Sequence, residues 1–409
     1  MLSGFLRYNT YPSQLSPWER GDRDTKMAQL RILKVGIPVS LSGQFLAQGR
    51  QALTGLQTWA EDVNQRSGVS VSDPGPPLPV AVAYYDDASS PDVVRSITQR
   101  LIVEDRVDLL MGPYSSVLSQ AAAAVAEQHG YVLWNQGGAS DSIYRQGFRW
   151  VVGILTPASE YLAGLAQLVK EVAPGAERLA IVHASPGTFP RAVSSGAEGR
   201  AVGLGFKTVL LREYDPAITD FSEILDQVEQ VRPDVLLGVG RIQNDLLLSR
   251  QIAQRRLPLG TVAVVAAPIQ QFQNALGTDA EGFIGPSQWE PSGSYPHDYG
   301  PPAQQVLESL RRSDCPLDYP MAQAYAAGLV AQRCVEVACT LEQRALREAA
   351  VTLDFSTFYG RFKIDPDTGR QIGRSVVIIQ WQEGRKVVVW PPEQRQARLV
   401  YPWRQLEPT

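Results

Sequence analysis

The stretch that decides the fold is Lys34-Val-Gly-Ile-Pro-Val-Ser-Leu-Ser-Gly43, an apolar strand that runs into a turn just before a helix. The same pattern recurs at Tyr84-Tyr-Asp-Asp87 and at Met111-Gly-Pro-Tyr-Ser-Ser116. In open α/β sheets, ligands bind just beyond the carboxyl ends of such strands. None of the three stretches carries a nucleophile–base pair or a set of metal ligands. The pattern therefore favours a protein that holds a small molecule without changing it chemically.

Strands and helices alternate through most of the chain, in two successive cycles. The expected strands lie near 32–38, 80–86, 108–112, 131–135, 148–153, 178–183, 207–214, 234–238 and 261–266. Helices are expected near 45–66, 90–104, 116–129, 157–171, 189–203, 219–231, 243–256, 303–312 and 319–350. This alternation predicts an α/β protein of two similar lobes, each a mostly parallel sheet flanked by helices. The strands expected within 360–389 are too few for a third lobe, so we expect them to complete the first two.

Composition excludes several classes of protein. The 409 residues include 38 basic and 42 acidic ones, a net charge of −4, and no basic stripe, which argues against a nucleic-acid partner. No run of 18 apolar residues exists, so we expect no insertion into a membrane. The three histidines are scattered and the three cysteines show no CxxC spacing. We therefore expect no metal and no cofactor.

The first 30 residues are polar and contain no apolar leader. We expect this segment, 1–30, to be a loose tail, with Met27 as an alternative start. No cysteine near the N-terminus is available to carry a lipid. The sequence as encoded favours the cytoplasm, unless the true start lies upstream.

Two strand ends in the first cycle are candidate ligand contacts. Tyr114-Ser115-Ser116 precedes an Ala-rich helix, whose free N–H groups and partial positive charge suit a carboxylate or carbonyl oxygen. Simple capping by the serines is the alternative. Asn135-Gln-Gly-Gly-Ala-Ser-Asp141 follows the next strand, and its paired glycines allow either a close backbone approach or a flexible turn.

Two other patterns carry little weight. Asp86 and Asp87 end a strand, but a magnesium pocket needs a further carboxylate at a neighbouring strand end, and capping of the next helix is the better explanation. Gly238-Val-Gly240 resembles the start of a dinucleotide fingerprint, but Gln243 occupies the position of the third glycine. We find no catalytic constellation and expect no enzyme.

With these strand ends in view, the chain resembles the type I periplasmic-binding-protein superfamily, and within it the branched-chain amino acid and amide receptors of ABC importers. The resemblance spans about 32–392 and is carried by several short motifs in order. They are Val39-Ser-Leu-Ser-Gly43, Tyr85-Asp-Asp87 with Pro91, Gly112-Pro-Tyr-Ser-Ser116, Phe221-Ser-Glu-Ile-Leu225, Asp279-Ala-Glu-Gly282, Ala324-Tyr-Ala-Ala-Gly328, Asp365-Pro-Asp-Thr-Gly-Arg-Gln371 and Gln380-Trp381.

The resemblance implies two lobes that are joined by three crossing segments and close on a ligand. The implied N-lobe comprises 32–155 and 283–340, and the implied C-lobe comprises 156–282 and 341–395, followed by a C-terminal extension over 396–409. A small-molecule ligand and the permease subunits of an ABC transporter are the implied partners. The implied location is extracytoplasmic, in the periplasm or at the cell surface.

By position, the resemblance also implies which residues touch the ligand. Ser116 matches the serine that binds a ligand oxygen, and Ala139 falls where a hydroxyl is usual, so Ser140 is expected to replace it. Phe189 and Trp289 are expected as aromatic walls. The full implied set is Tyr114, Ser115, Ser116, Gly137, Gly138, Ala139, Ser140, Phe189, Arg241, Ile242, Pro268 and Trp289.

The chain departs from the family at two points. Amino acid receptors place an acid after the strand near 261–266, where this chain has Ala266-Ala-Pro-Ile269, and Gln48 replaces an aromatic residue. Without that acid, the ammonium of an amino acid would be poorly paired in a closed cleft. We therefore expect a ligand with an uncharged amine or an amide-like group, or an organic acid if Arg241 faces the cleft.

Three functions stay open at this point. The leading one is a solute receptor for an ABC importer that captures an amino acid, amide or organic acid. A cytosolic ligand sensor of the same fold is the main alternative, and an α/β enzyme is a remote one.

Overall fold

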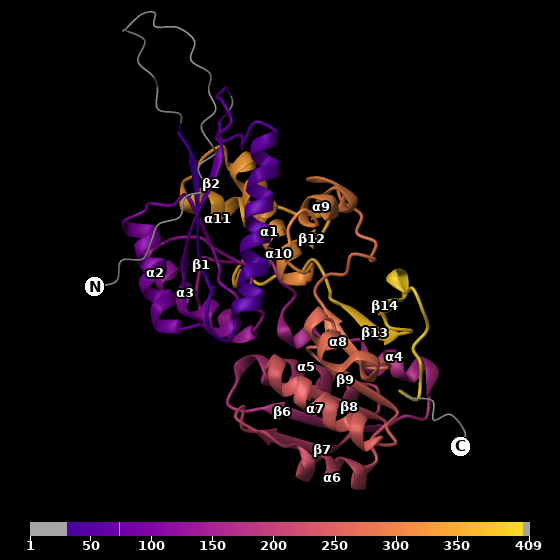
Figure 1. Cartoon of the computed structure of the whole chain (residues 1–409). Coiled ribbons are helices and arrows are strands. Elements are labelled where there is room, and N and C mark those ends of the chain that lie inside the picture. Colours follow the sequence, from indigo (N-terminus) through magenta and orange to yellow (C-terminus); the bar gives the residue numbers. More distant parts are fainter. Residues whose placement is uncertain (1–30, 73, 404–409) are drawn as a thin grey trace, which may run out of the picture.

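The computed structural model describes residues 31–72 and 74–403, which form two α/β lobes (Figure 1). The predicted tail over 1–30 lies outside the described residues. The N-lobe sheet is parallel throughout, with the strand order β2-β1-β3-β4-β5. Its strands are β1 Leu33–Val39, β2 Val80–Asp86, β3 Leu109–Met111, β4 Leu133–Asn135 and β5 Val151–Gly153. All five lie where the sequence predicts them.

Helices cover both faces of the N-lobe sheet. One face packs against α1 (Leu46–Gln65) and α10 (Tyr319–Ala338), and the other packs against α2 (Pro91–Val103) and α3 (Ser116–His129). Figure 1 shows α1 and α10 side by side, although more than 250 residues separate them in the sequence. The predicted helix over 319–350 is interrupted after α10, and α11 (Gln343–Thr352) forms its second part.

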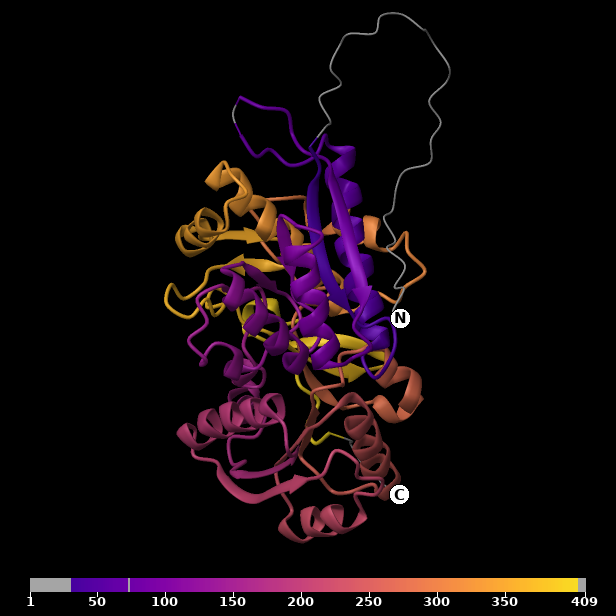
Figure 2. The ribbon, with the colours of Figure 1, turned by 90° about the vertical axis from the view of Figure 1, so that its left-hand side faces the viewer.

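The C-lobe sheet has seven strands in the order β14-β13-β10-β9-β8-β6-β7. They are β6 Arg178–Ala184, β7 Lys207–Tyr214, β8 Val235–Val239, β9 Thr261–Val264, β10 Ile284–Ser287, β13 Val377–Gln382 and β14 Arg385–Trp390. The strands from β7 to β10 are parallel, and β13 and β14 add an antiparallel edge. Figure 2 shows the N-lobe above the C-lobe.

The C-lobe sheet is also covered on both faces. Its helices are α4 Leu165–Val172, α5 Thr188–Gly203, α6 Ser222–Val231, α7 Ile242–Arg255 and α8 Gln270–Leu276. The short α8 was not predicted. The N-lobe is completed by α9 Ala303–Leu310 and by the hairpin of β11 Phe355–Thr357 and β12 Gly360–Phe362.

Two predicted lobe boundaries differ from the structure. Strand β10 pairs with β9 and β13, so the chain returns to the N-lobe after Ser287 and not before 283. Helix α11 is held on the N-lobe, because Gln343 bonds Val132 and Asp108. The last crossing therefore follows β12. The described part of the predicted extension, 396–403, packs on the C-lobe.

Glycines set how closely α1 and α10 approach. A Cβ on the buried Gly55 of α1 would lie 2.0 Å from the carbonyl oxygen of Met321 in α10. A Cβ on Gly328 of α10 would likewise lie 2.2 Å from the ring of Trp59. The two helices therefore pack at a distance that only glycine permits.

We expect Gly55→Ala to destabilise the fold by about 2 kcal/mol, because the new methyl group forces the α1 and α10 backbones apart. Gly199→Ala is the matched control, since Gly199 lies in α5 with open space around it. That change should stabilise by roughly 0.5–1 kcal/mol through helix propensity. Urea denaturation of both variants measures the difference, and equal stability of Gly55→Ala and the wild type would contradict the close packing.

Candidate functional site

The candidate site lies where the carboxyl ends of the two sheets face the region between the lobes. In the N-lobe, β3 leads into 112–115 before α3, and the neighbouring β4 leads into 136–140. In the C-lobe, β6 leads into α5 and β8 leads into α7. Parallel strands thus bring loops that are distant in sequence to one edge, as expected for an open α/β sheet.

Aromatic residues from both lobes gather at this place. The hydroxyl oxygens of Tyr114, after β3, and Tyr319, at the start of α10, lie 3.1 Å apart. The ring of Phe45 lies edge-on to Tyr114, with centroids 5.9 Å apart. From the C-lobe, Tyr161 and Phe189 form a second edge-on pair at 5.5 Å. Burial raises the pKa of Tyr161, and the nearby hydroxyl of Tyr114 contributes to this rise. The predicted residues Tyr114 and Phe189 therefore belong to one aromatic cluster.

The two serines before α3 differ in their hydrogen bonding. Ser116 Oγ accepts a hydrogen bond from the backbone N–H of Ser140 at 3.0 Å. Ser115 Oγ is buried and has no hydrogen-bond partner within 31–72 and 74–403. The hydroxyl that lacks a partner among the described residues is thus that of Ser115, whereas Ser116 joins two loops of the N-lobe.

The second strand-end loop is packed against the first. A Cβ on Gly137 would lie 2.0 Å from the carbonyl oxygen of Pro113, so this glycine allows the two loops to approach each other. A Cβ on Gly138 would lie 2.5 Å from the side chain of Ser119. Ser140 Oγ accepts from the N–H of Ser142 at 3.4 Å, and Ala139 O accepts from Ala158 N at 2.8 Å. These groups of the loop bond within the protein, whereas Gln136 Oε1 has no partner among the described residues.

The other predicted residues lie in different surroundings. Arg241 is exposed at the start of α7, and Ile242 packs against the C-lobe core. Pro268 is buried, and its carbonyl oxygen accepts from Lys386 Nζ at 2.7 Å. Trp289 is not a wall of the cleft as predicted, because its ring is 1% exposed, packs against Phe358 and donates to the Phe358 carbonyl oxygen at 3.1 Å.

A buried charged cluster joins the lobes, and sequence reasoning missed it. Asp318, just before α10, accepts from Gln51 Nε2 of α1 at 3.3 Å and from the backbone N–H of Gln270 in α8 at 3.1 Å. Lys386 of β14 lies 3.9 Å from Asp318 and 3.1 Å from Glu290. Burial raises the pKa of both carboxyl groups, and the ammonium of Lys386 opposes that rise. No sequence signal identifies this cluster, because its members come from distant segments.

Lys386→Met leaves two buried carboxylates without their cation, so we expect a loss of about 3 kcal/mol in the free energy of unfolding. Lys363→Met is the control, because Lys363 pairs with Asp354 at the surface, and its removal should cost less than about 1 kcal/mol. Urea denaturation near neutral pH compares the two, and similar losses would contradict a structural role for the cluster.

Asp245 of α7 ties the ends of two C-lobe strands. Its Oδ2 accepts from the N–H of Ala266, just after β9, at 3.0 Å, and its side chain lies against Gly240, just after β8. Burial raises the pKa of Asp245 to about 7, although these backbone N–H groups oppose the rise. The side chain thus shapes the C-lobe edge that faces the cleft.

A folded-state pKa raised from 3.8 to about 7 means that the unfolded chain ionises Asp245 first as pH rises. The stability from this group is therefore present below about pH 4 and is lost between about pH 4 and 7. We expect the stability of the wild type relative to Asp245→Asn to fall over that window, by up to about 1.4 kcal/mol per pH unit. Urea denaturation at several pH values measures this, and a difference independent of pH would contradict the raised pKa.

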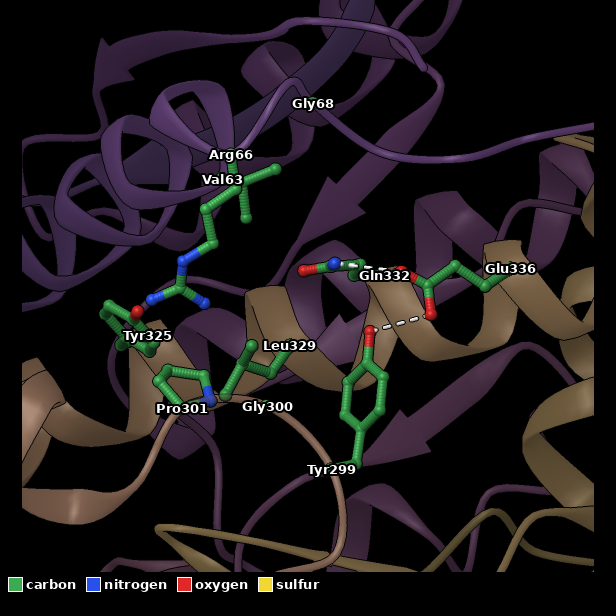
Figure 3. Close-up of a pocket in the computed structure, with 10 residues that line it drawn as sticks. All are labelled: Val63, Arg66, Gly68, Tyr299, Gly300, Pro301, Tyr325, Leu329, Gln332 and Glu336. Atoms are coloured by element: carbon green, nitrogen blue, oxygen red, sulfur yellow. Dashed lines mark hydrogen bonds between the residues drawn. The ribbon is translucent and has the colours of Figure 1, made fainter. Parts of the chain in front are cut away.

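A separate cavity of about 120 Å³ lies within the N-lobe (Figure 3). It is lined by residues of α1, α10 and the loop before α9. Its polar groups bond to one another, since Tyr299 and Gln332 both donate to Glu336, at 3.0 and 2.9 Å. No C-lobe residue lines this cavity, so lobe closure does not complete it, and the interlobe cluster is the better candidate site.

Two lobes that place aromatic rings and a free hydroxyl between them define a two-lobed solute-binding protein. The model of the periplasmic binding protein family matches residues 32–386, and this chain belongs to that family. The expected resemblance to the branched-chain amino acid receptors is thereby confirmed. In the described residues, no helix is both long and apolar enough to span a bilayer.

Relatives of known name are distant. The chain is 22% identical to the Leu/Ile/Val-binding protein BraC3 of Rhizobium johnstonii, over 87% of this chain and 93% of that protein. It is 24% identical to Leu/Ile/Val-binding protein homolog 8 of Brucella abortus, where the match spans only 56% of that protein. Both names belong to binding proteins rather than enzymes.

Solved structures share the fold. A leucine-binding protein of Thermotoga maritima has a TM-score of 0.75 at 20% identity and covers 87% of this chain and 97% of its own. A solute-binding protein of an ABC transporter from R. palustris, solved with benzoate, has a TM-score of 0.73 at 17% identity, with 90% and 98% covered. Neighbours of one fold thus hold different ligands.

Proposed function

We propose that this chain is the solute-binding receptor of an ABC importer and captures a small organic acid with an aromatic ring between its lobes. It would work outside the cytoplasm, present the ligand to the permease subunits and catalyse no reaction. The aromatic cluster carries this proposal, because Tyr114 and Phe189 approach the site from different lobes. Flat aromatic walls favour a flat ligand by edge-on and stacked contacts.

The hydrogen-bonding capacity of the site also favours an acid. Ser115 offers a hydroxyl with no partner in the described chain, next to the start of α3. A helix start favours a negatively charged ligand group. The acids Asp318 and Glu290 are already bound to Lys386 and to amide donors. They therefore offer no free partner for the ammonium group of an amino acid.

The comparisons support the ligand class without deciding it. Structural neighbours from R. palustris were solved with benzoate and with 4-hydroxybenzoate, and one from Streptococcus pneumoniae was solved with isoleucine. The pairing of Asp318 and Glu290 with Lys386 and the five aromatic rings of the cluster favour an aromatic acid as the ligand of this chain.

Isothermal titration of the purified protein with benzoate, 4-hydroxybenzoate, leucine and isoleucine tests the proposal. We expect the aromatic acids to bind and the two amino acids to bind at least tenfold more weakly, because their ammonium stays unpaired. At 100 times its dissociation constant, a ligand should stabilise the protein by about 2.7 kcal/mol in a parallel thermal unfolding experiment. Binding of leucine without binding of either acid would refute the ligand class.

The serine assignment has its own test. Ser115→Ala should weaken binding of the aromatic acid by about 10- to 100-fold, the value of a hydrogen bond to a charged group. Ser116→Ala is the matched control, since its hydroxyl bonds Ser140, and the same titration should show a smaller loss. A larger loss in Ser116→Ala would favour the position that the family resemblance implies.

A further inference from the structure

The three segments that pass between the lobes are tied to one another by side chains. Thr156 and Gln288 exchange two hydrogen bonds, from Thr156 N to Gln288 Oε1 at 3.2 Å and from Gln288 Nε2 to Thr156 O at 2.9 Å. Arg374, in the third segment, donates from Nη2 to the carbonyl oxygen of Gln288. The guanidinium of Arg374 is thus fixed at the junction of the lobes.

This guanidinium lacks a counter-ion. Its Nη1 is buried with no hydrogen-bond partner, and Arg374 forms no ion pair in the part of the chain that the structure describes. Arg370, four residues earlier, instead lies within 4.0 Å of Asp141 and 3.7 Å of Glu160. Arg374 is partly exposed, but a buried N–H group without a partner is costly, so Nη1 calls for a physical explanation.

A second unpaired donor lies beside the ring of Tyr359, against which Arg374 packs. The Arg374 Cζ is 3.9 Å from the centroid of the Tyr359 ring. Gln323 of α10 is fully buried, its Oε1 lies 3.5 Å from the Tyr359 hydroxyl, and its Nε2 has no partner among the described residues. The unpaired hydrogen-bonding groups next to Tyr359 are therefore N–H donors from two separate segments. Such donors suit a ligand group with several acceptor atoms.

The two unpaired donors lie near the aromatic cluster. Gln288 Nε2 also donates to the hydroxyl of Tyr161 at 3.0 Å, and Tyr161 packs against Phe189. Burial raises the pKa of Tyr161, whereas the charge of Arg374 lowers it, so the guanidinium is within electrostatic reach of that hydroxyl. The aromatic cluster and the two free donors thus adjoin at Tyr161.

We infer that Arg374, assisted by Gln323, binds the carboxylate of the ligand and selects acids over their neutral analogues. This inference rests on the proposed function and adds the residue that distinguishes a charged ligand from a neutral one. Arg374 Nη1 and Gln323 Nε2 donate to the carboxylate oxygens, and the ring of the ligand extends from there between Tyr161 and the other aromatic side chains. A guanidinium presents planar, charge-assisted donors that suit a carboxylate.

The test compares an acid with its neutral analogue in matched variants. We expect the wild type to bind 4-hydroxybenzoate at least tenfold more tightly than 4-hydroxybenzamide in isothermal titration. Arg374→Gln should weaken the acid by 10- to 100-fold and change the amide less than threefold, so the preference for the acid disappears. Arg370→Gln removes the same charge from the same segment and should keep the preference.

A structural role alone would give a different result. If Arg374→Gln weakens acid and amide equally, Arg374 only ties the crossing segments, and the inference is wrong. If this variant does not fold by circular dichroism, Arg374→Lys decides, since a retained cation should keep the preference for the acid and its loss would contradict the inference. If the wild type binds neither benzoate nor 4-hydroxybenzoate, the proposed function itself fails, and the assignment of Arg374 falls with it.

Discussion

The arrangement of the two lobes depends on hydrogen bonds between the segments that connect them. The backbone N–H and C=O of Thr156 bond to the side-chain amide of Gln288. Arg374 joins a third segment to this junction through its bond to the Gln288 carbonyl oxygen. Buried polar groups with all partners in place are rigid and specific, because any other register would leave some of them unpaired. In the proposed receptor, a lobe rotation would therefore occur about this junction, which would fix the edges that meet on closure.

Electrostatics is the basis of the proposal that the site binds an acid rather than an amino acid. The segment after β9, Ala266–Ile269, contains no acid. Asp318 and Glu290 nevertheless reach the same region from other segments. Both share the ammonium of Lys386, so their charge stabilises the junction of α8, α10 and β14. The Ser115 hydroxyl and Nη1 of Arg374 stay unpaired within the described chain. In this region, Lys386 therefore neutralises Asp318 and Glu290, whereas some N–H and O–H donors have no partner among the described residues.

The sequence predicted the parts of the fold that local patterns determine. Strands β1 to β9 and the helices between them follow apolar periodicity and turn residues, and strand ends such as Tyr114 to Ser116 follow directly from them. Strand β10, Ile284-Gly-Pro-Ser287, has no such signal, because two of its four residues disfavour strands and its partner β13 lies about 90 residues later. Trp289 and Asp318 show the same limit, since only tertiary packing decides whether a ring enters the core or a carboxylate meets a lysine.

The adjacent serines show that a shift of one position in a family comparison changes which hydroxyl is assigned to the ligand. Ser115 and Ser116 differ by one residue, but the start of α3 directs the second hydroxyl to Ser140 and leaves the first without a partner in the described chain.

In the proposed receptor, Arg374 and the aromatic rings would contribute to binding in different ways. Arg374 lies in a crossing segment, so its contact with a carboxylate would exist before and after closure and would contribute affinity. Phe189 belongs to the C-lobe alone, so the contact of a ligand ring with both Phe189 and Tyr114 forms only on closure. Because a ligand shifts a conformational equilibrium only through contacts that differ between the two states, the ring and not the acid group would drive closure.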